Sequence, residues 1–576
     1  MDKRIRVLRV GLMVVTGVIL MRLFFVQIVQ KGEWVAKAEA QHTVENTIKA
    51  RRGEIYMMDG EEPVQVVMNE TAYNVIVDPM ILDEEEAKKV LFTEGLSGAL
   101  VEGAEEVFSD RTRRYFILAK GVSRDEAERI REAGLAGVYL REVVRRVYPE
   151  GELGARVLGF VNDDGEGQYG VEGALDTELS GKDGLLKTVA DVNQVALSIG
   201  DENVKIPAED GKDVVLTIDR NIQDGVERIL QEKMTEMGRD QASAVVMDPR
   251  NGEILAMANL PGYDPANYAQ VEDAAVYINR VTEDPYEPAS VCKAFTFAAG
   301  IDLGVMNAES TYYNVDTIYI DGWPISNASQ NGSAVRTMQY ALNWSLNVGS
   351  IQALKWIGGN PDAITEEGRK KLYDYYVNKF GLGRETGIEL YEAEGLIGDP
   401  VEGDGRDSLY ANMTFGQNML LTMLQVTAGY ASLINGGEYY TPTVVKGEMK
   451  DGELVERGQA EPVRRTVSEE TSRQMREMLW GTRSYPRLYG VDKAGYYIGG
   501  KTGTAQVIRD GKYVMDETVA TYVGFGGAEG EESRYVVMVR IWKDGTMSGG
   551  DTYALPIFSA ISDFLIDYME IKPGGV

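Results

Sequence analysis

The apolar residues at the start of the chain form one nearly continuous run over residues 10–29, in which Arg22 and Gln27 are the strongly polar interruptions. Four basic residues precede it: Lys3, Arg4, Arg6 and Arg9. A helix of this length spans about 30 Å, the thickness of the hydrocarbon core of a membrane. The pattern predicts a cytoplasmic tail over 1–9 and a single transmembrane helix over 10–29. The basic flank places the rest of the chain outside the cytoplasm.

A cleaved signal peptide is the alternative for the same segment. Residues 10–21 alone have a suitable length for its apolar region. The candidate cleavage site at Ala36 and Ala38 lies beyond Arg22 and Trp34, far from that apolar region. The spacing therefore favours an uncleaved anchor in the cell membrane.

Residues 30–213 mix strand-like runs with charged helical pieces. Residues 72–78 read AYNVIVD, which is typical of a strand. Residues 123–134 predict a helix with Ser123 as its N-cap, Glu126 at the capping-box position and Gly134 at its end. No cluster of catalytic residue types occurs here. We expect an irregular domain over 30–213 that serves as a spacer or an interaction module.

The pattern changes at residue 214. A strand leads into a helix that ends near Met237, and residues 242–259 contain two apolar runs around a turn, which predicts a β-hairpin. Helices and loops follow, then three strand-like runs and a last amphipathic helix over 556–569. Strands at both ends with helices between them predict an α+β domain over 214–576, with an antiparallel sheet.

Composition narrows the possible chemistry. The chain of 576 residues is too long for one hydrophobic core, and its net charge of -31 would repel nucleic acid over most of the surface. One cysteine, Cys292, and one histidine, His42, exclude a disulfide framework, cysteine-rich metal sites and HExxH metal chemistry. A Ser-His-Asp triad would have to recruit His42 from far away. A nucleophile in the main body therefore needs another base.

Ser290 and Lys293 offer that combination. Residues 290–303 predict a helix that stops at Gly304, and residues three apart share a helix face. A serine hydroxyl needs a neighbouring base, and burial at the start of a helix favours the neutral amine of a lysine. Cys292 should be a small buried hydrophobic residue. Taken alone, Lys293 could equally be a surface lysine on the rim of a helix.

Two further motifs follow downstream. Ser345 and Asn347 lie in a short break between helical runs, where they could also cap the next helix. Lys501, Thr502 and Gly503 lie in a strand-like run, although KTG could also form a turn. The order of the three motifs makes the combination specific.

The trio SVCK, SLN and KTGT resembles the active site of penicillin-binding proteins and serine β-lactamases. The resemblance extends through VVMDPRNGEILAMAN, FGLGRETGIEL, FGQNMLLTMLQVTAGYASLINGG and TVATYVGFG. Upstream, RRGEIYMMDG and LGFVNDDGEGQYGVEGALDTELSGKDG resemble the pedestal, or dimerisation-type, domain of class B penicillin-binding proteins. The chain departs from the family at residues 57–60 and at Ala289, where glycine is common.

The resemblance implies a role for each motif residue. Ser290 would be the acylated nucleophile, Lys293 its general base, and Ser345 and Asn347 a proton relay and a substrate-amide contact. Lys501 would attract the substrate carboxylate. On the same strand, Thr502 and Thr504 would supply hydroxyl groups to the substrate, and Gly503 would let its backbone approach closely. The backbone N–H groups of Ser290 and Thr504 would form the oxyanion hole.

The resemblance also implies a reaction: cross-linking of peptidoglycan stem peptides, built on lipid II-derived glycan, through a serine acyl-enzyme that β-lactams also form. No metal or cofactor is expected. The glycosyltransferase motif of bifunctional relatives is absent from the sequence, so a glycan polymerase of the SEDS type, among other wall-synthesis membrane proteins, would be the partner. The alternatives are a catalytically idle scaffold, a D,D-carboxypeptidase and a β-lactamase. Division, elongation and sporulation roles are not distinguished.

Overall fold

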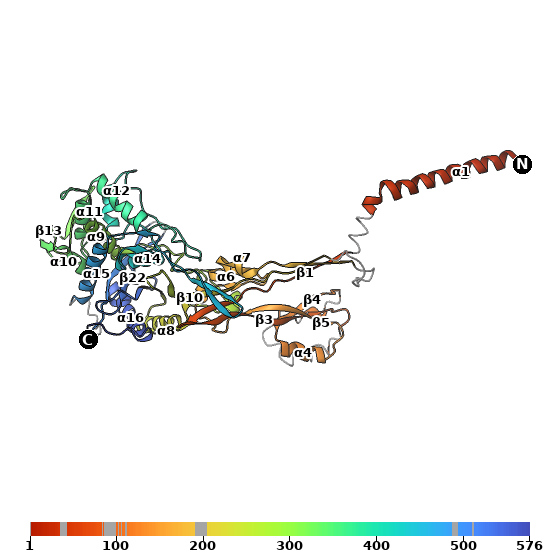
Figure 1. Ribbon diagram of the computed structural model, residues 1–576, viewed down its shortest axis with the longest axis horizontal. Helices are drawn as coiled ribbons and strands as arrows, with labels where there is room; N and C mark the ends of the chain where they lie inside the picture. The colour runs from red at the N-terminus through yellow and green to blue at the C-terminus, as the bar shows by residue number, and fades with distance from the viewer. Residues whose placement is uncertain are drawn as a thin grey trace. The chain divides into compact units, whose positions relative to one another are not determined.

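The computed structural model describes residues 2–34, 43–82, 85, 100–101, 103–104, 106–109, 112–189, 204–485, 494–509 and 512–575 (Figure 1). These residues form two compact units. The first unit comprises Met1–Gly53 and Ser180–Lys212, and the second comprises Glu54–Leu179 and Asp213–Val576. His42 and the candidate cleavage residues Ala36 and Ala38 lie outside the described residues.

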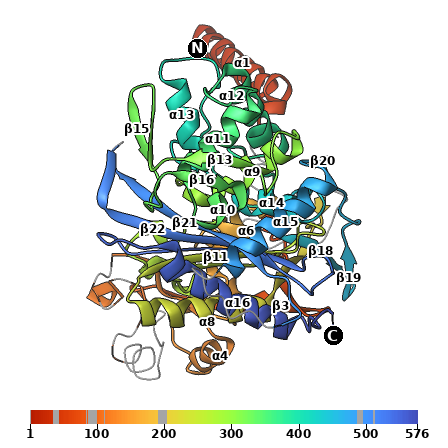
Figure 2. The same cartoon turned by 90° about the vertical axis from the view of Figure 1, so that its left-hand side faces the viewer.

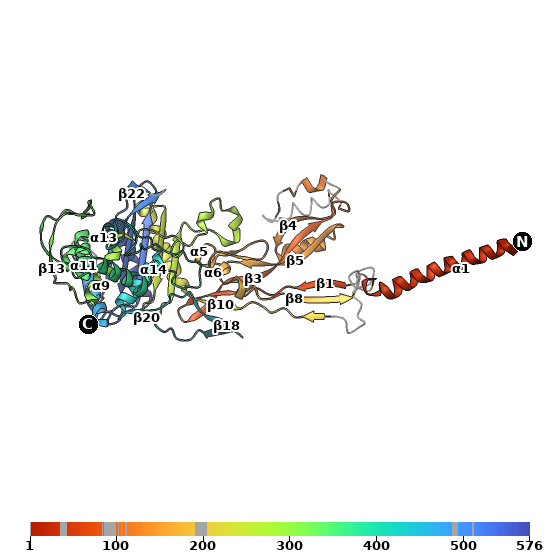
Figure 3. The same cartoon turned by 90° about the horizontal axis from the view of Figure 1, so that it is seen from above.

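The first unit contains the N-terminal helix and a small sheet. Helix α1 (Asp2–Phe24) continues into η1 (Phe25–Val29), and the stretch is long and apolar enough to cross a membrane. Its apolar side chains are exposed; Leu12, for example, is 67% exposed. The predicted helix over 10–29 is thus confirmed. The sheet has the antiparallel order β1-β8-β9, and Figure 3 shows β1 beside β8. Its strands are β1 (Thr43–Ile48), β8 (Gly184–Val189) and β9 (Val204–Ile206).

The second unit begins with a seven-stranded sheet in the order β19-β18-β10-β2-β3-β4, in which β5 also pairs with β3. Its strands are β2 (Ile55–Asp59), β3 (Glu62–Val77), β4 (Phe116–Val122), β5 (Val138–Val147), β10 (Asp213–Asp219), β18 (Val445–Lys450) and β19 (Glu453–Glu456). The strand predicted at 72–78 is the end of β3. Ser123 caps α4 (Arg124–Glu132) in a capping box with Glu126, as predicted.

Short elements complete this part of the second unit. They are η2 (Glu106–Ser109), α5 (Ala155–Leu158), β6 (Phe160–Val161), β7 (Gly167–Gln168), α6 (Gly170–Ala174), α7 (Asp176–Ser180), η3 (Pro265–Gln270) and η4 (Ala274–Val276).

A five-stranded antiparallel sheet, in the order β12-β11-β23-β22-β21, organises the rest of the unit. Its strands are β11 (Gln241–Met247), β12 (Ile254–Leu260), β21 (Gly499–Arg509), β22 (Lys512–Gly526) and β23 (Tyr535–Trp542). The hairpin predicted over 242–259 is β11–β12. Alternate residues of β11 enter opposite cores: Val245 packs in one and Val246 in the other. Burial on both faces explains why these strands read as continuous apolar runs.

Helices cover both faces of this sheet, as Figure 2 shows. Helices α8 (Arg220–Met237) and α16 (Leu555–Tyr568) pack on one face with Val246 and its neighbours. The other face is covered by a larger group: α9 (Lys293–Asp302), α10 (Met338–Asn343), α11 (Asn347–Ile357), α12 (Glu366–Tyr373), α13 (Arg406–Met413), α14 (Met423–Ile434) and α15 (Glu469–Ser484). This arrangement confirms the α+β class predicted from the sequence.

Short hairpins and turns lie around the helical layer. They are η5 (Ala289–Cys292), β13 (Thr311–Asn314) paired with β16 (Ala334–Thr337), β14 (Thr317–Ile320) paired with β15 (Trp323–Ser326), β17 (Glu438–Tyr439) paired with β20 (Arg464–Arg465), η6 (Asp374–Lys379) and η8 (Gly550–Ala554).

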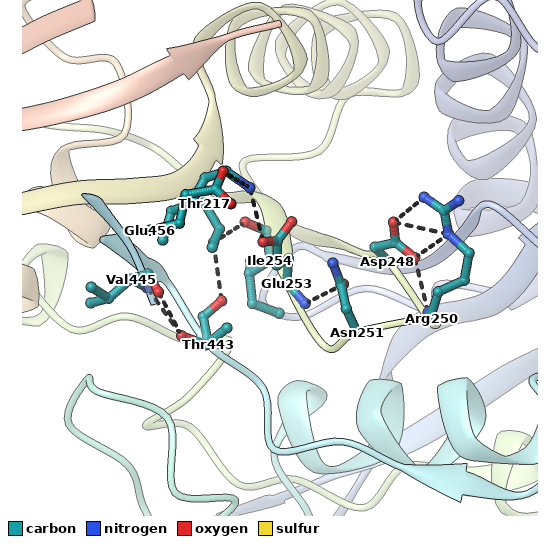
Figure 4. Close-up of polar contacts among 10 residues, drawn as sticks. Thr217, Asp248, Arg250, Asn251, Glu253, Ile254, Thr443, Val445 and Glu456 are labelled. Carbon is teal, nitrogen blue, oxygen red and sulfur yellow. Dashed lines mark hydrogen bonds and ion pairs between the residues drawn. The ribbon is translucent and has the colours of Figure 1, made fainter. Parts of the chain in front are cut away.

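Buried hydrogen bonds fasten the two sheets of the second unit to each other. The Thr217 hydroxyl on β10 donates to the carbonyl of Ile254 at 2.7 Å and to that of Thr443 at 3.0 Å (Figure 4). In the β11–β12 turn, the Arg250 guanidinium donates to the Asp248 carboxylate at 2.9 Å. Because the two Thr217 contacts join segments far apart in the sequence, the sheet that bears the C-terminal strands is anchored on the first one.

The helical run predicted from Ser290 is present, with a difference in its first turn. Ser290 lies in the 3₁₀ turn η5, and the α-helix α9 follows from Lys293. Ala289 has φ 54°, in the left-handed region that an α-helix does not use, and its N–H donates to the Gly416 carbonyl at 3.0 Å. This tertiary contact diverts the backbone just before the serine.

Candidate active site

Ser290 and Lys293 meet at the junction of η5 and α9. Residues i and i+3 of a 3₁₀ turn lie above one another, so the departure from the α-helix keeps the pair together. The Lys293 Nζ lies 2.9 Å from the Ser290 Oγ. The predicted serine–lysine pair therefore exists as a direct hydrogen bond.

Lys293 is completely buried. The alternative that it is a surface lysine on the rim of a helix is therefore wrong. Its Nζ also contacts the Ser345 carbonyl at 2.7 Å, the Ser345 Oγ at 3.0 Å and the Asn347 Oδ1 at 2.8 Å. Among the described residues, no carboxylate forms an ion pair with it. Burial, and secondarily the positive charge of Lys501, hold the pKa of Lys293 well below its usual value. The lowered pKa favours the neutral amine more than at an exposed lysine.

Ser345 lies in the predicted break between α10 and α11, and Asn347 is the first residue of α11. Ser345 has φ 54°, a conformation that non-glycine residues hold only when surrounding contacts enforce it. Leu346 is the N-cap of α11, and the N–H of Val348 in its first turn donates to the Asn327 Oδ1 at 3.0 Å, so the alternative that Ser345 or Asn347 caps the helix is wrong. The Asn347 Nδ2 donates to the Ser326 carbonyl at 2.8 Å, while its Oδ1 faces Lys293.

Lys501, Thr502, Gly503 and Thr504 lie on strand β21, so the turn alternative for KTG is wrong. Lys501 is 1% exposed and its Nζ donates to the Thr502 carbonyl at 3.1 Å. The Thr504 Oγ1 accepts from the N–H of Gly550 at 3.2 Å. The strand is paired over this whole segment, and Thr504 aligns with Ala520 of β22.

Gly503 allows β21 to pack against the serine turn. A Cβ there would lie 2.2 Å from the Thr521 Oγ1 and 3.0 Å from the Pro288 carbonyl. The close neighbours of Gly503 are thus protein atoms, including backbone two residues before Ser290. A larger residue would push the strand away from the nucleophile.

A cleft of about 320 Å³ opens over these motifs. Six of the predicted residues line it: Ser290, Ser345, Asn347, Thr502, Gly503 and Thr504. Lys293 and Lys501 are buried beside it. Residues from three distant parts of the sequence therefore converge on one cleft, and all eight predicted residues lie at it or next to it.

Glu287 was not among the residues predicted for the site. This carboxylate is 3% exposed, and its Oε1 accepts from the N–H of Asn418 at 2.7 Å and from the Tyr513 hydroxyl at 2.8 Å. It ties the serine turn to the segment around Gln417, which lines the cleft, and to the β22 end of the β21–β22 hairpin. Burial raises the pKa of Glu287. Its position directly before Pro288 is the one local feature that could have pointed to a role near the serine turn.

Two family descriptions match the chain. The penicillin binding protein transpeptidase domain matches residues 242–563, and the penicillin-binding protein dimerisation domain matches residues 47–216. The first match contains the whole cleft.

Individual relatives agree with these matches. Stage V sporulation protein D of Bacillus subtilis is 29% identical over 96% of this chain and 83% of its own length. The peptidoglycan D,D-transpeptidase FtsI of Escherichia coli is 30% identical over 80% of this chain and 74% of its own length. Among solved structures, penicillin binding protein 3 from Mycobacterium tuberculosis, complexed with aztreonam, is 25% identical with a TM-score of 0.67. That similarity covers 92% of this chain and 98% of the other.

Proposed function

Because the chain belongs to the class B penicillin-binding proteins, we propose that it is a serine-type peptidoglycan D,D-transpeptidase whose nucleophile is Ser290. The observation that carries the proposal is the environment of Lys293. Its buried amine lies 2.9 Å from the Ser290 hydroxyl, and its hydrogen-bond partners among the described residues are neutral oxygens. This is the arrangement that a serine needs from a lysine base.

In the acylation step, the neutral Lys293 amine accepts the proton of the Ser290 hydroxyl while the Ser290 Oγ attacks the carbonyl of the D-Ala-D-Ala bond. The C–N bond then breaks. The departing amine of the terminal D-alanine receives a proton through Lys293 and Ser345, whose hydroxyl is 3.0 Å from the lysine. The product is an ester between Ser290 and the shortened stem peptide.

In the transfer step, the amine of a second stem peptide attacks this ester. A new amide bond forms, the C–O bond to Ser290 breaks, and the proton lost by the amine returns to the serine oxygen through the same lysine. Atoms and charge balance without an added reactant. The new amide bond is the cross-link.

The residues around Ser290 divide the work of substrate binding in this proposal. The buried charge of Lys501, with the hydroxyl groups of Thr502 and Thr504, attracts the carboxylate of the terminal D-alanine. Asn347 holds a substrate amide. The backbone N–H groups of Ser290 and Thr504 stabilise the negative oxygen that develops during attack.

The N-terminal helix and the family membership indicate a membrane-anchored protein. We propose that its N-terminus is cytoplasmic and its catalytic domain extracytoplasmic, as the basic flank favours. A glycan polymerase of the SEDS type is the proposed partner. The proposed domain limits remain 1–9 for the tail, 10–29 for the span, 30–213 for the pedestal and 214–576 for the transpeptidase domain.

The test is a reaction of the purified full-length protein with a stem pentapeptide and an amine acceptor. The proposal predicts release of D-alanine together with a cross-linked product, and slow release of bound penicillin. Hydrolysis without cross-linking would indicate a carboxypeptidase, and rapid turnover of penicillin a β-lactamase. Absence of any reaction or penicillin adduct from a folded protein would indicate a scaffold.

A further inference from the structure

A cavity of about 540 Å³ lies apart from the active-site cleft, at the end of the five-stranded sheet where β11 turns into β12. Its walls come from that turn, from β20, from the first half of α15 and from the connection between β22 and β23. Among the described residues, none lines both this cavity and the cleft. A ligand bound here would therefore leave the space around Ser290 free.

Charged side chains dominate the lining of this cavity. Four arginines and three glutamates line it among the described residues, which gives the lining a net positive charge in a chain of net charge -31. Three of the arginines have carboxylate partners: Arg250 with Asp248 at 2.9 Å (Figure 4), Arg465 with Glu438 at 3.4 Å, and Arg473 with Glu470 at 2.6 Å. The charges of these three arginines are thus compensated within the protein.

Arg476 and Glu532 differ from the other charged residues of the lining. In the described part of the chain, neither forms an ion pair, with the other or with a third residue. Arg476 is half-buried, and its guanidinium donates to the carbonyl of Glu531 at 2.9 Å. Burial lowers the pKa of Arg476, because its charge is partly withdrawn from water. The cavity therefore holds one cation and one anion that lack counter-ions.

A ligand that carries both charges would supply the two missing partners. The planar guanidinium of Arg476 matches a carboxylate, and the exposed carboxylate of Glu532 matches an amine. A ligand with several negative charges would be repelled by the three glutamates of the lining. The volume of the cavity lies in the range of about 300–1,000 Å³ that is typical of small-ligand sites.

We propose that this cavity binds a zwitterionic ligand of the amino acid or peptide class, whose carboxylate pairs with Arg476 and whose amine pairs with Glu532. The source of the ligand rests on the function proposed above. In that reaction, the released terminal D-alanine and an uncross-linked stem peptide both carry a carboxylate and an amine. The cavity is thus a second site, outside the cleft, for a product or a substrate of the enzyme.

The experiment measures binding of D-alanine and of a stem pentapeptide to the full-length protein by calorimetry, after benzylpenicillin has acylated Ser290 and filled the cleft. The proposal predicts saturable binding of at least one of the two ligands. Binding of D-alanine as tight as that of the pentapeptide would identify the product as the ligand, and binding of the pentapeptide alone would identify the stem peptide. Saturable binding of neither ligand would overturn the proposal.

Two variants test the charges separately. Arg476→Met should weaken binding of the ligand about tenfold, but should not change binding of a form whose carboxylates are amidated. Glu532→Gln should weaken binding to a similar extent, but should not change binding of a form whose amines are acetylated. Arg228→Met, at an exposed position of α8 outside the cavity, is the matched control and should bind as the unmodified protein does.

Losses that do not depend on which group of the ligand is blocked would overturn the assignment of Arg476 and Glu532, as would unchanged binding in both variants. Because Glu532 is exposed, Glu532→Gln keeps the test available if Arg476→Met does not fold. If the unmodified protein forms no penicillin adduct, the proposed function fails instead. The two variants still test the cavity in that case, because neither residue lines the cleft.

Discussion

Two buried cations in the second unit differ in what surrounds them. Arg146, on β5, donates to the Glu172 carboxylate at 2.7 Å, and the two side chains are 5% and 0% exposed. Lys293, in the cleft region, is 0% exposed and contacts hydroxyl, carbonyl and amide oxygens. A buried charge with a carboxylate partner keeps its charge and contributes to structure. A buried lysine with neutral partners loses its proton more easily and becomes available as a base.

The difference also separates two kinds of polar residue that look similar in the sequence. Arginine remains protonated in almost any environment, whereas burial shifts the pKa of lysine readily. The Arg146–Glu172 ion pair lies in the segment that matches the dimerisation domain of the family. Lys293 lies in the segment that matches the transpeptidase domain. The comparison therefore predicts that changes at Arg146 affect stability and that changes at Lys293 affect the reaction.

The largest expected effect is that of Lys293→Arg. The guanidinium keeps a positive charge but does not deprotonate at working pH, so acylation by penicillin should fall about 10² to 10⁴-fold, as for a lost general base. Stopped-flow or gel-based labelling with a fluorescent penicillin measures the rate. Lys370→Arg, at an exposed position of α12, should react normally. Near-normal acylation by Lys293→Arg would mean that charge alone matters at this position.

The second prediction concerns Arg146→Met, which leaves the Glu172 carboxylate buried without this ion pair. Loss of one partner from a buried pair costs about 3–5 kcal/mol, so the denaturation midpoint should fall strongly. The acylation rate per folded molecule should not change. Arg145→Met is the control, because Arg145 pairs with Glu70 at the surface, where such a pair contributes about 0–1 kcal/mol. Equal denaturation midpoints for Arg146→Met and Arg145→Met would contradict the distinction between the buried ion pair and the surface ion pair.

A smaller effect should appear in the pH dependence of acylation. Lys293 acts as a base only when neutral, so the first-order rate at saturating penicillin should fall as pH drops through its lowered pKa. The positive charge of Lys501 contributes to that lowering. Lys501→Gln should therefore raise the pKa of Lys293 and move the acid limb to higher pH. If the acid limb of the pH–rate profile stays in place in Lys501→Gln, or moves to lower pH, the coupling of Lys293 to Lys501 is contradicted.

The smallest effect is expected at Glu227 on α8, a half-buried acid that accepts hydrogen bonds from the N–H of Gly154 and from Gln223. Burial raises its pKa from 4.5 to about 7. The folded state therefore favours the protonated form, and its stability contribution is present below pH 4.5 and lost as pH rises towards 7. Glu227→Gln should match the unmodified protein near pH 4 and be more stable at pH 8, by chemical denaturation. Lower stability at pH 8 would contradict this assignment.

Much of the fold was predictable because local rules agree with the tertiary structure. The capping box at Ser123, the β11–β12 hairpin and the final amphipathic helix depend on neighbours within a few residues. The left-handed backbone of Ala289 just before the serine helix could not be predicted, because it is held by a remote contact, from the N–H of Ala289 to Gly416. The Ser290–Lys293 contact was still predicted correctly, since 3₁₀ and α-helical turns both bring residues three apart together.

The rest of the site depends on packing between distant segments. The order of the three motifs indicated that Ser290, Ser345 and Lys501 belong together, but local patterns could not show the distances among them. Glu287 was missed because its partners, Asn418 and Tyr513, are more than a hundred residues away in the chain. The cavity lined by Arg476 and Glu532 was missed for the same reason. Its walls come from elements that meet only in the folded protein.

The most direct test of the central claim is to locate the penicillin adduct by mass spectrometry of a digest of the labelled full-length protein. The account predicts one adduct, on Ser290. Ser290→Ala should abolish it, whereas Cys292→Ala, at the buried neighbour two residues away, should retain it. An adduct on another residue, or one that persists in Ser290→Ala, would contradict the assignment of Ser290 as the nucleophile and of Lys293 as its base.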